Sequence, residues 1–297
     1  MRLDPDIEDR ATRAEAPASQ ADLDRLTRLV RDSLGIDLRP FKSAIVRQRL
    51  SHRIKELGLA NLGEYLDVLE GPDTNSERDN LISAITTNVT QFFREAHHFE
   101  LLSHDVLPGL LDHARAGGRV RLWSAGCSSG QEPFSIAACI LDLCPEVPRL
   151  DLKILATDID PAILAVARQA VFRSEEVQKL SQARRLALFG ETAGRERLTI
   201  RADVADLVAF KRLNLVDPWP MRHSFDVIFC RNVAIYFDAD LREQLWQRFV
   251  AALSEGGRLF VGHSERILGP ALAQLEHAGV TTYRKRGGPL PAPQSGP

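Results

Sequence analysis

Several signals that would quickly assign a function are missing from this sequence of 297 residues. No apolar run approaches the length of a membrane span, and the polar N-terminus has no apolar stretch typical of a signal peptide. The four cysteines show no C-x-x-C spacing, so we expect reduced, buried thiols in a cytoplasmic protein. A net charge of −2 argues against nucleic-acid binding through overall charge. G-x-G-x-x-G is absent too, which argues against a dinucleotide-binding enzyme.

The composition is that of a globular protein, with 44% hydrophobic and 26% charged residues, and the ends differ from the rest. Residues 1–20 are rich in charge and alanine, and residues 287–297 are rich in proline and glycine, so we expect disorder at both ends. Apolar residues recur at helical spacing over residues 21–88, and this pattern predicts helices and no strands. Gly58 is a candidate C-cap, Asn61 a candidate N-cap and Gly71-Pro72 a stop signal. This region predicts a small all-helical domain.

Strand-like and helix-like stretches alternate over residues 89–286. Such alternation predicts an α/β domain with a mostly parallel sheet and helices on both faces. Thr281–Arg284 is a candidate late antiparallel edge strand. The alternation is interrupted at about 189–210, where we expect a small inserted antiparallel β-subdomain that could meet a partner. The expected parallel strands are 119–124, 153–157, 208–213, 226–230 and 258–262.

The most informative stretch is Leu122–Pro133, in which an apolar strand is followed by glycines and a helix start. Gly126 and Gly130 remove side chains where the backbone must bend and where a ligand could lie against it. Glu132 lies in the first turn of the helix and places a carboxylate there. A phosphate bound at such a turn would be held by N–H groups alone. S-adenosylmethionine fits an acidic glycine loop because it has a sulfonium, an ammonium and a ribose. An ordinary strand-to-helix turn is the alternative from this loop alone.

Ligands of open α/β sheets bind beyond the carboxyl ends of the strands, so the residues that follow each strand are the next candidates. Asp158 is placed to accept ribose hydroxyls, while Asp160 precedes Pro161 in an N-cap position. Asn214-Leu215 offer amide and apolar contacts to an adenine. Arg231 follows an apolar strand and can meet an anion there, although an arginine at such a position is often only a surface charge.

Five runs together resemble the chemotaxis receptor methyltransferases, the CheR family, in order and spacing over about residues 21–286. They are N-x-T-x-F-F-R at 88–94, G-x-E-P at 130–133, D-I-D at 158–160, F-C-R-N-x-x-I-Y-F at 229–237 and G-H-S-E at 262–265. Read alone, the first run could be a linker and the fourth could be core packing. The resemblance implies a protein-glutamate O-methyltransferase with a helical N-terminal domain and a Rossmann-like catalytic domain that carries a β-subdomain.

The resemblance also implies roles for individual residues. Arg94, Arg231 and Tyr236 would surround the transferred methyl group. Gln131 and Phe134 depart from the family pattern, which puts fine specificity in doubt but not the activity. S-adenosylmethionine would be the cofactor and S-adenosylhomocysteine the product, with no metal. With Gly126 from the glycine loop, the expected cofactor contacts are Asn88, Thr90, Arg94, Glu132, Asp158, Asn214, Leu215, Arg231 and Asn232.

The implied acceptor is a glutamate carboxylate, which is ionised at neutral pH because its ordinary pKa is about 4.3. A carboxylate oxygen can attack the sulfonium methyl directly, so the reaction needs no general base. Arg94 or Arg231 would orient the acceptor through charge-assisted hydrogen bonds. Tyr236 would line the path of the methyl group.

Residues 41–55 hold five basic residues, Lys42, Arg47, Arg49, Arg53 and Lys55, and no acidic residue. Arg49 and Arg53 share one helix face, which by itself could be merely solvated or could meet nucleic acid. The resemblance places both arginines in the receptor-facing helix of the family. We therefore expect a monomeric enzyme that acts on the glutamate-rich cytoplasmic domain of a chemoreceptor, without binding nucleic acid or inserting into a membrane. The alternatives are methylation of another signalling protein and a non-catalytic sensor of the cofactor or its product.

Overall fold

The computed structural model describes residues 18–38, 43–72, 74–190 and 196–287, which form two compact units. The first unit contains the described residues up to Thr87 together with Tyr236–Asp238. The second contains Asn88–Ile235 and the described residues from Ala239 onward. The expected disordered ends at 1–17 and 288–297, and the basic residue Lys42, lie outside the described residues.

The first unit is helical, as predicted, and two of its helices begin at side-chain caps. The Ser19 side chain accepts a hydrogen bond from the backbone N–H of Asp22, and the Asn61 side chain accepts one from Glu64. An antiparallel bridge between Ile36 and Phe237 joins the segment 236–238 to this unit. The helices are α2 (Gln20–Leu34), α3 (Ser43–Glu56), α4 (Leu62–Glu70) and α5 (Asn75–Ile85).

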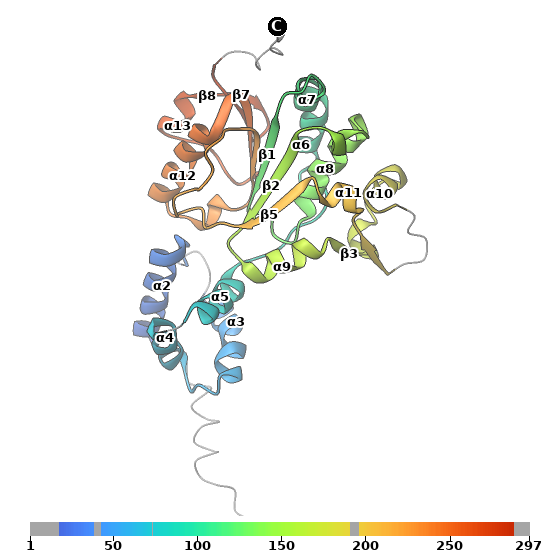
Figure 1. The fold of residues 1–297 in the computed structure, drawn as a ribbon. Helices are drawn as coiled ribbons and strands as arrows, with labels where there is room; N and C mark the ends of the chain where they lie inside the picture. The colour runs from blue at the N-terminus through green and yellow to red at the C-terminus, as the bar shows by residue number, and fades with distance from the viewer. Residues whose placement is uncertain (1–17, 39–42, 73, 191–195, 288–297) are drawn as a thin grey trace, which may run out of the picture. The chain divides into compact units, whose positions relative to one another are not determined.

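The second unit is built on a seven-stranded sheet with the order β5-β2-β1-β6-β7-β9-β8 (Figure 1). The first five strands in this order pair in parallel, and β9 pairs antiparallel with both β7 and β8. The prediction of a mostly parallel sheet is therefore confirmed. The strands are β1 (Val120–Ala125), β2 (Leu152–Asp158), β5 (Val208–Arg212), β6 (Phe225–Cys230), β7 (Leu253–Val261), β8 (Leu275–Gly279) and β9 (Thr282–Lys285).

Helices cover both faces of this sheet (Figure 1). From β1 the chain passes through α8 (Gln131–Leu143) to β2, while from β6 it passes through α12 (Ala239–Ala252) to β7 in the opposite direction along the sheet. Because such crossovers are right-handed, α8 and α12 lie on opposite faces. Within the described ranges, every helix is too short or too polar to span a lipid bilayer. The other helices are α6 (Ala96–Leu101), the π-helical η1 (Leu102–Val106), α7 (Leu107–Arg115), α9 (Pro161–Gln169) and α13 (Pro270–Ala273).

A separate two-stranded antiparallel sheet pairs β3 (Val171–Arg173) with β4 (Arg197–Thr199). The expected β-subdomain thus draws its first strand from residues before 189, while residues 208–212 belong to the central sheet as β5. The ring of Phe172 lies 4.9 Å from that of Phe92, which packs the small sheet against the main core. Residues 191–195 of the intervening turn lie outside the described residues. The helical pieces of this region are η3 (Ser174–Val177), α10 (Gln182–Phe189) and α11 (Ala202–Ala205).

The prediction of an edge strand at Thr281–Arg284 needs a correction. The antiparallel strand is present as β9, but it lies between β7 and β8, so β8 forms the edge of the sheet. The residues of β8 include no β-branched residue and no Phe, Tyr or Trp, and the sequence therefore carried no strand signal there.

Candidate active site

The loops that follow β1 and β6 meet at the point where the strand order of the sheet reverses. The chain leaves β1 toward β2, whereas β6 lies on the other side of β1. Ligands of doubly wound sheets bind in the crevice at such a switch point. Glu132 follows β1 and Arg231 follows β6, so the fold brings these two predicted site residues together at this edge of the sheet.

Arg231 is the centre of a buried ion cluster. Its side chain is 2% exposed, and its Nη2 lies 3.3 Å from Glu95 Oε2 while its Nη1 lies 3.2 Å from Glu132 Oε2. Nη2 also donates a hydrogen bond to the backbone carbonyl of Arg94. The reading of Arg231 as a solvated surface charge is therefore excluded, because its donors are held inside the site.

The cluster has more negative than positive groups, since two carboxylates face one guanidinium. Burial raises the pKa of Glu132, although Arg231 and a 2.7 Å hydrogen bond from Ser124 Oγ act in the opposite direction. Burial also acts to raise the pKa of Glu95, but Arg231 and His263, whose Nδ1 lies 3.0 Å from Glu95 Oε1, lower it below its usual value. Glu132 is therefore the carboxylate whose ionisation a cationic ligand would stabilise.

Asp158 holds the glycine loop in place. Its Oδ2 accepts a hydrogen bond from the backbone N–H of Ser128 at 2.8 Å, and its Oδ1 accepts one from Asp160 at 3.1 Å. Burial raises the pKa of this carboxyl group. Asp160 instead caps α9, as predicted, and its Oδ2 accepts a 2.9 Å hydrogen bond from the Asn88 side chain. The structure thereby brings the predicted residues Asn88 and Asp158 to the same loop.

Gly126 is required by both its conformation and its surroundings. Its φ is +83°, and a Cβ at this position would lie 2.3 Å from Cγ2 of Val233. No larger residue could occupy this place without displacing the loop after β6. The glycine thus allows the loops after β1 and β6 to approach each other.

Glu265 fixes the turn that follows Arg231. Its side chain is buried, and its two oxygens accept four backbone hydrogen bonds of 2.6 to 2.9 Å. Burial raises the pKa of Glu265, while these N–H groups act to lower it. Among the residues it holds is the predicted cofactor contact Asn232, whose φ of +59° is unusual for a residue with a side chain. The four donors are the N–H groups of Asn232, Val233, Ala234 and Gly262.

Left-handed backbone is concentrated in these loops. Of the six non-glycine residues with positive φ in the described chain, four lie here: Phe93, Glu95, Ser128 and Asn232. Such conformations cost free energy and persist where the surrounding structure holds them, often at functional sites. Sequence reasoning missed Glu95, Ser128 and Glu265, although Glu95 directly follows one recognised motif and Glu265 ends another.

Arg94 differs from Arg231 in how its donors are used. Its Nη1 donates to the carbonyl of Val89 at 3.0 Å, and in the described part of the chain no partner faces its Nε or Nη2. Thr90, close by in sequence, is half-buried. Arg94 is therefore the guanidinium with donors left for a ligand.

The remaining predicted contacts lie after β5 and beyond β6. Asn214 Oδ1 accepts a hydrogen bond from the N–H of Val216 at 3.3 Å, and Leu215 is buried. Tyr236 ends the short helix η4 (Ala234–Tyr236), belongs to the first unit, and accepts a 2.8 Å hydrogen bond at its carbonyl from Asp37. Its place along the path of the methyl group stays a prediction.

The two arginines predicted to face a receptor form hydrogen bonds within the first unit. Arg53 forms a fork with Glu77, with N···O distances of 2.9 and 2.6 Å, and donates to Glu56 at 3.0 Å. Arg49 Nη1 donates to the carbonyl of Thr86 at 2.9 Å. Arg53 thus has a structural role of its own, and any contact it makes with a receptor stays a prediction.

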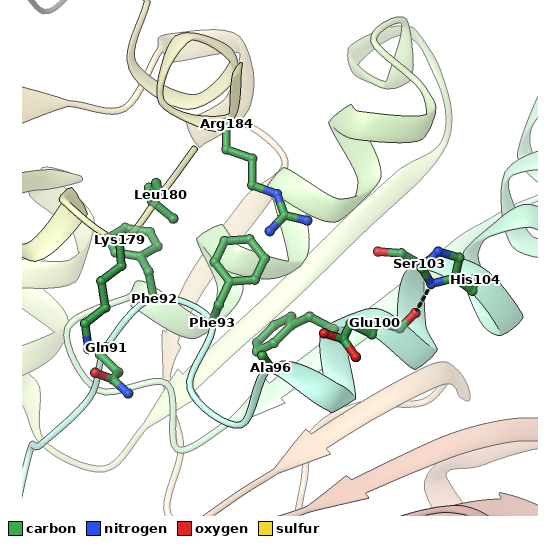
Figure 2. Close-up of a pocket in the computed structure, with 11 residues that line it drawn as sticks. Gln91, Phe92, Phe93, Ala96, Glu100, Ser103, His104, Lys179, Leu180 and Arg184 are labelled. Carbon is green, nitrogen blue, oxygen red and sulfur yellow. Dashed lines mark hydrogen bonds between the residues drawn. The ribbon is translucent and has the colours of Figure 1, made fainter. Parts of the chain in front are cut away.

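A cavity of about 440 Å³ lies beside the segment that precedes Arg94 (Figure 2). Aromatic rings form part of its wall, and the guanidinium of Arg184 lies 4.1 Å from the centre of the Phe93 ring. Lys179 and His104 add polar groups. None of the predicted site residues lines this cavity, so it is distinct from the cluster around Arg231.

Two family models match the chain: the CheR methyltransferase all-alpha domain over residues 21–86 and the CheR methyltransferase SAM-binding domain over residues 88–283. A probable chemotaxis protein methyltransferase of Rhizobium etli is 46% identical and covers 86% of this chain and 96% of its own. The chemotaxis protein methyltransferase of Escherichia coli is 39% identical, with 83% and 85% covered. That of Borreliella burgdorferi is 36% identical, with 89% and 94% covered. With both of its units matched, the chain belongs to the CheR methyltransferase family.

Proposed function

We propose that this protein transfers a methyl group from S-adenosylmethionine to glutamate side chains on the cytoplasmic helices of a chemoreceptor. The products are glutamate methyl esters and S-adenosylhomocysteine, and the enzyme acts in the cytoplasm. The observation that carries the proposal is the buried cluster of Arg231, Glu95 and Glu132 at the switch point, with its excess of negative charge. A cationic ligand compensates this charge, whereas the phosphates of a dinucleotide would be repelled by it.

The residues present fit S-adenosylmethionine. Gly126 lets the loops after β1 and β6 lie close together, and the carboxylate of Glu132 is largely buried without a full countercharge. Asp158 offers carboxylate oxygens suited to ribose hydroxyls, and Asn214-Leu215 offer amide and apolar contacts to an adenine. Asn88, Thr90 and Asn232 complete the proposed set. When bound, S-adenosylmethionine supplies an electrophilic methyl group on a positively charged sulfur.

The role of the protein in the reaction is to bind, orient and exclude water. A glutamate acceptor is already ionised at pH 7, so no residue has to remove a proton from it. Holding two reactants in the correct geometry can supply about 7–11 kcal/mol of the barrier in favourable cases. A dedicated general base is therefore not required in this site.

Arg94 is the better candidate for orienting the acceptor carboxylate. Both Nη groups of Arg231 are directed at Glu95, Glu132 and a backbone carbonyl, and its Nε is buried, whereas Arg94 keeps Nε and Nη2 free of partners within the described chain. A guanidinium fork holds a carboxylate with defined geometry. The interaction must not be too strong, because the acceptor loses its charge as the ester forms and tight ground-state binding does not accelerate chemistry.

The test is methyl transfer from labelled S-adenosylmethionine to purified cytoplasmic fragments of chemoreceptors. We expect base-labile label on glutamate, and a loss of about 100-fold in kcat/KM for Arg94→Ala with a much smaller change in S-adenosylhomocysteine affinity. Arg149→Ala is the matched control, because Arg149 is exposed and precedes β2 at the amino end of the strands. Cofactor binding without ester formation on any fragment would support a non-catalytic sensor instead. Wild-type kcat/KM in Arg94→Ala would remove the proposed role of this residue.

A further inference from the structure

A buried histidine beside the Arg231 cluster has no role in the proposed reaction. His98 is fully buried, and its Nδ1 has no hydrogen-bond partner among the described residues. It faces Glu95 Oε2 at 3.5 Å, an oxygen that itself accepts no hydrogen bond in the described chain. This separation is longer than an ordinary N–H···O hydrogen bond. Two buried polar atoms therefore face each other without a shared proton.

The other nitrogen of the ring fixes the tautomer. His98 Nε2 lies 3.2 Å from the carbonyl of Val280 and 2.8 Å from Oγ1 of Thr281. Because a carbonyl can only accept, we assign the hydrogen to Nε2. Burial, together with the nearby charge of Arg231, lowers the pKa of His98 to about 3, so the ring is neutral and Nδ1 carries a lone pair. Histidines that ligate metals are oriented in this way, with the second nitrogen donating to a carbonyl.

We propose that Glu95, His97 and His98 form a binding site for a divalent transition-metal ion such as Zn²⁺. Two nitrogen or oxygen ligands of a tetrahedral Zn²⁺, each about 2.0–2.2 Å from the metal, are about 3.3–3.5 Å apart. The 3.5 Å between His98 Nδ1 and Glu95 Oε2 matches this separation. Each of the three side chains offers one ligand atom, and these atoms lie within 4.8 Å of one another. His97 is exposed, so its ring can turn to complete the coordination.

The donor set indicates which ions the site would prefer. Imidazole nitrogens suit Zn²⁺, Cu²⁺, Ni²⁺ and Co²⁺, whereas Mg²⁺ and Ca²⁺ prefer oxygen ligands. Glu95 Oε2 also lies 3.3 Å from Arg231 Nη2, so a metal ion would compete with the guanidinium for this oxygen. Metal binding is therefore expected to inhibit methyl transfer, a consequence that rests on the proposed function, whereas the binding itself does not.

The experiment is calorimetric titration of the metal-free full-length protein with Zn²⁺. The variant His97→Ala removes the exposed ligand without touching the Arg231 cluster. We expect it to weaken Zn²⁺ binding by at least about tenfold, since even loss of a group that only orients a ligand costs about 10–100-fold. His104→Ala is the matched control, because His104 is also exposed but bonds to the carbonyl of Glu100 outside the site. The control should bind Zn²⁺ as the wild type does.

A second variant tests the buried ligand. His98→Phe keeps a ring that can pack against Phe260, whose ring centre lies 5.4 Å from that of His98, and thermal melting reports whether it folds. Loss of the Zn²⁺ equivalent in His97→Ala, and in His98→Phe where that variant is folded, supports the site. No saturable Zn²⁺ binding by the wild type, or unchanged binding in His97→Ala, overturns it. Titration of the same wild-type sample with S-adenosylhomocysteine separates the two proposals, because failure there would contradict only the proposed function.

Discussion

Each of the two units holds an arginine among carboxylates, and the two clusters differ in how completely their polar atoms are satisfied. In the first unit, Glu77 accepts hydrogen bonds from Arg53, Tyr65 and Asn80, and the fork from Arg53 holds its pKa below the usual value. In the second unit, Nε of Arg231 has no hydrogen-bond partner among the described residues.

The difference indicates that the two clusters have different roles. A buried network whose members are all bonded stabilises and specifies a fold. A cluster with surplus charge and a carboxyl group of raised pKa is instead typical of a site that is completed by a ligand. Glu77 has the features of the first kind, and Glu132 has the raised pKa expected of the second. The following predictions test this contrast, in order of decreasing expected effect.

Arg231→Met should have the largest effect. It leaves Glu95 and Glu132 buried without their common partner, and breaking a buried pair in this way costs about 3–5 kcal/mol of stability. Because the loops after β1 and β6 lose the side chain that joins them, we also expect kcat/KM for methyl transfer to fall by at least about 100-fold. Denaturant unfolding and the labelled-cofactor assay measure the two effects. Activity close to wild type would show that the cluster is not part of the site.

Arg53→Met is the same substitution in the other cluster and should affect stability alone. Loss of charge-assisted hydrogen bonds to Glu77 costs about 1.5–3 kcal/mol, toward the lower end because the side chain of Arg53 is 30% exposed. Affinity for S-adenosylhomocysteine should equal that of the wild type when measured by calorimetry well below the melting temperature. A parallel loss of this affinity would contradict the contrast between the clusters.

Glu77 and Glu132 should also respond to acid with opposite signs. Because the folded-state pKa of Glu77 is lowered, its stabilising contribution is present above the unfolded value of about 4.3 and is lost as pH falls through the folded pKa. The folded-state pKa of Glu132 is raised, so its contribution is present below the unfolded value and is lost as pH rises through the folded pKa.

The consequence for binding is measurable. Cofactor affinity should weaken as pH falls through the raised pKa of Glu132, by up to about tenfold per pH unit below it, because protonation removes the charge that a cationic ligand compensates. Glu132→Gln should bind the cofactor weakly and without this pH dependence. An equally steep pH profile in Glu132→Gln would assign the titration to another group.

The smallest effect concerns the basic helix. Charge reversal at Arg53 would break the bond to Glu77 and confound any test of receptor contact. Lys55 belongs to the same basic run and is exposed. We expect Lys55→Glu to raise KM for a receptor fragment severalfold, corresponding to about 1 kcal/mol, while cofactor affinity and melting temperature stay at their wild-type values. An unchanged KM would argue against a receptor contact at Lys55.

Local and periodic signals predicted the all-helical unit, the parallel sheet and the capping role of Asp160. The motif residues Glu132, Asp158 and Arg231 could be expected in one place because the carboxyl ends of parallel strands share one edge of a sheet. The partners of these residues could not be predicted, because a side chain such as Glu265 reaches the turn after Arg231 from more than 30 positions away in the chain. The hydrogen bonds between Arg53 and Glu77, 24 positions apart in the chain, could not be predicted for the same reason.

The four N–H groups collected by Glu265 have a consequence for the motions of the site. They come from two stretches of backbone, yet all of them depend on one side chain. If Glu265 turns away, all four amides lose their acceptors in a single event, so they should exchange with solvent deuterium at a common rate. That rate would report how often the turn that carries Arg231 loosens, in the absence of any substrate.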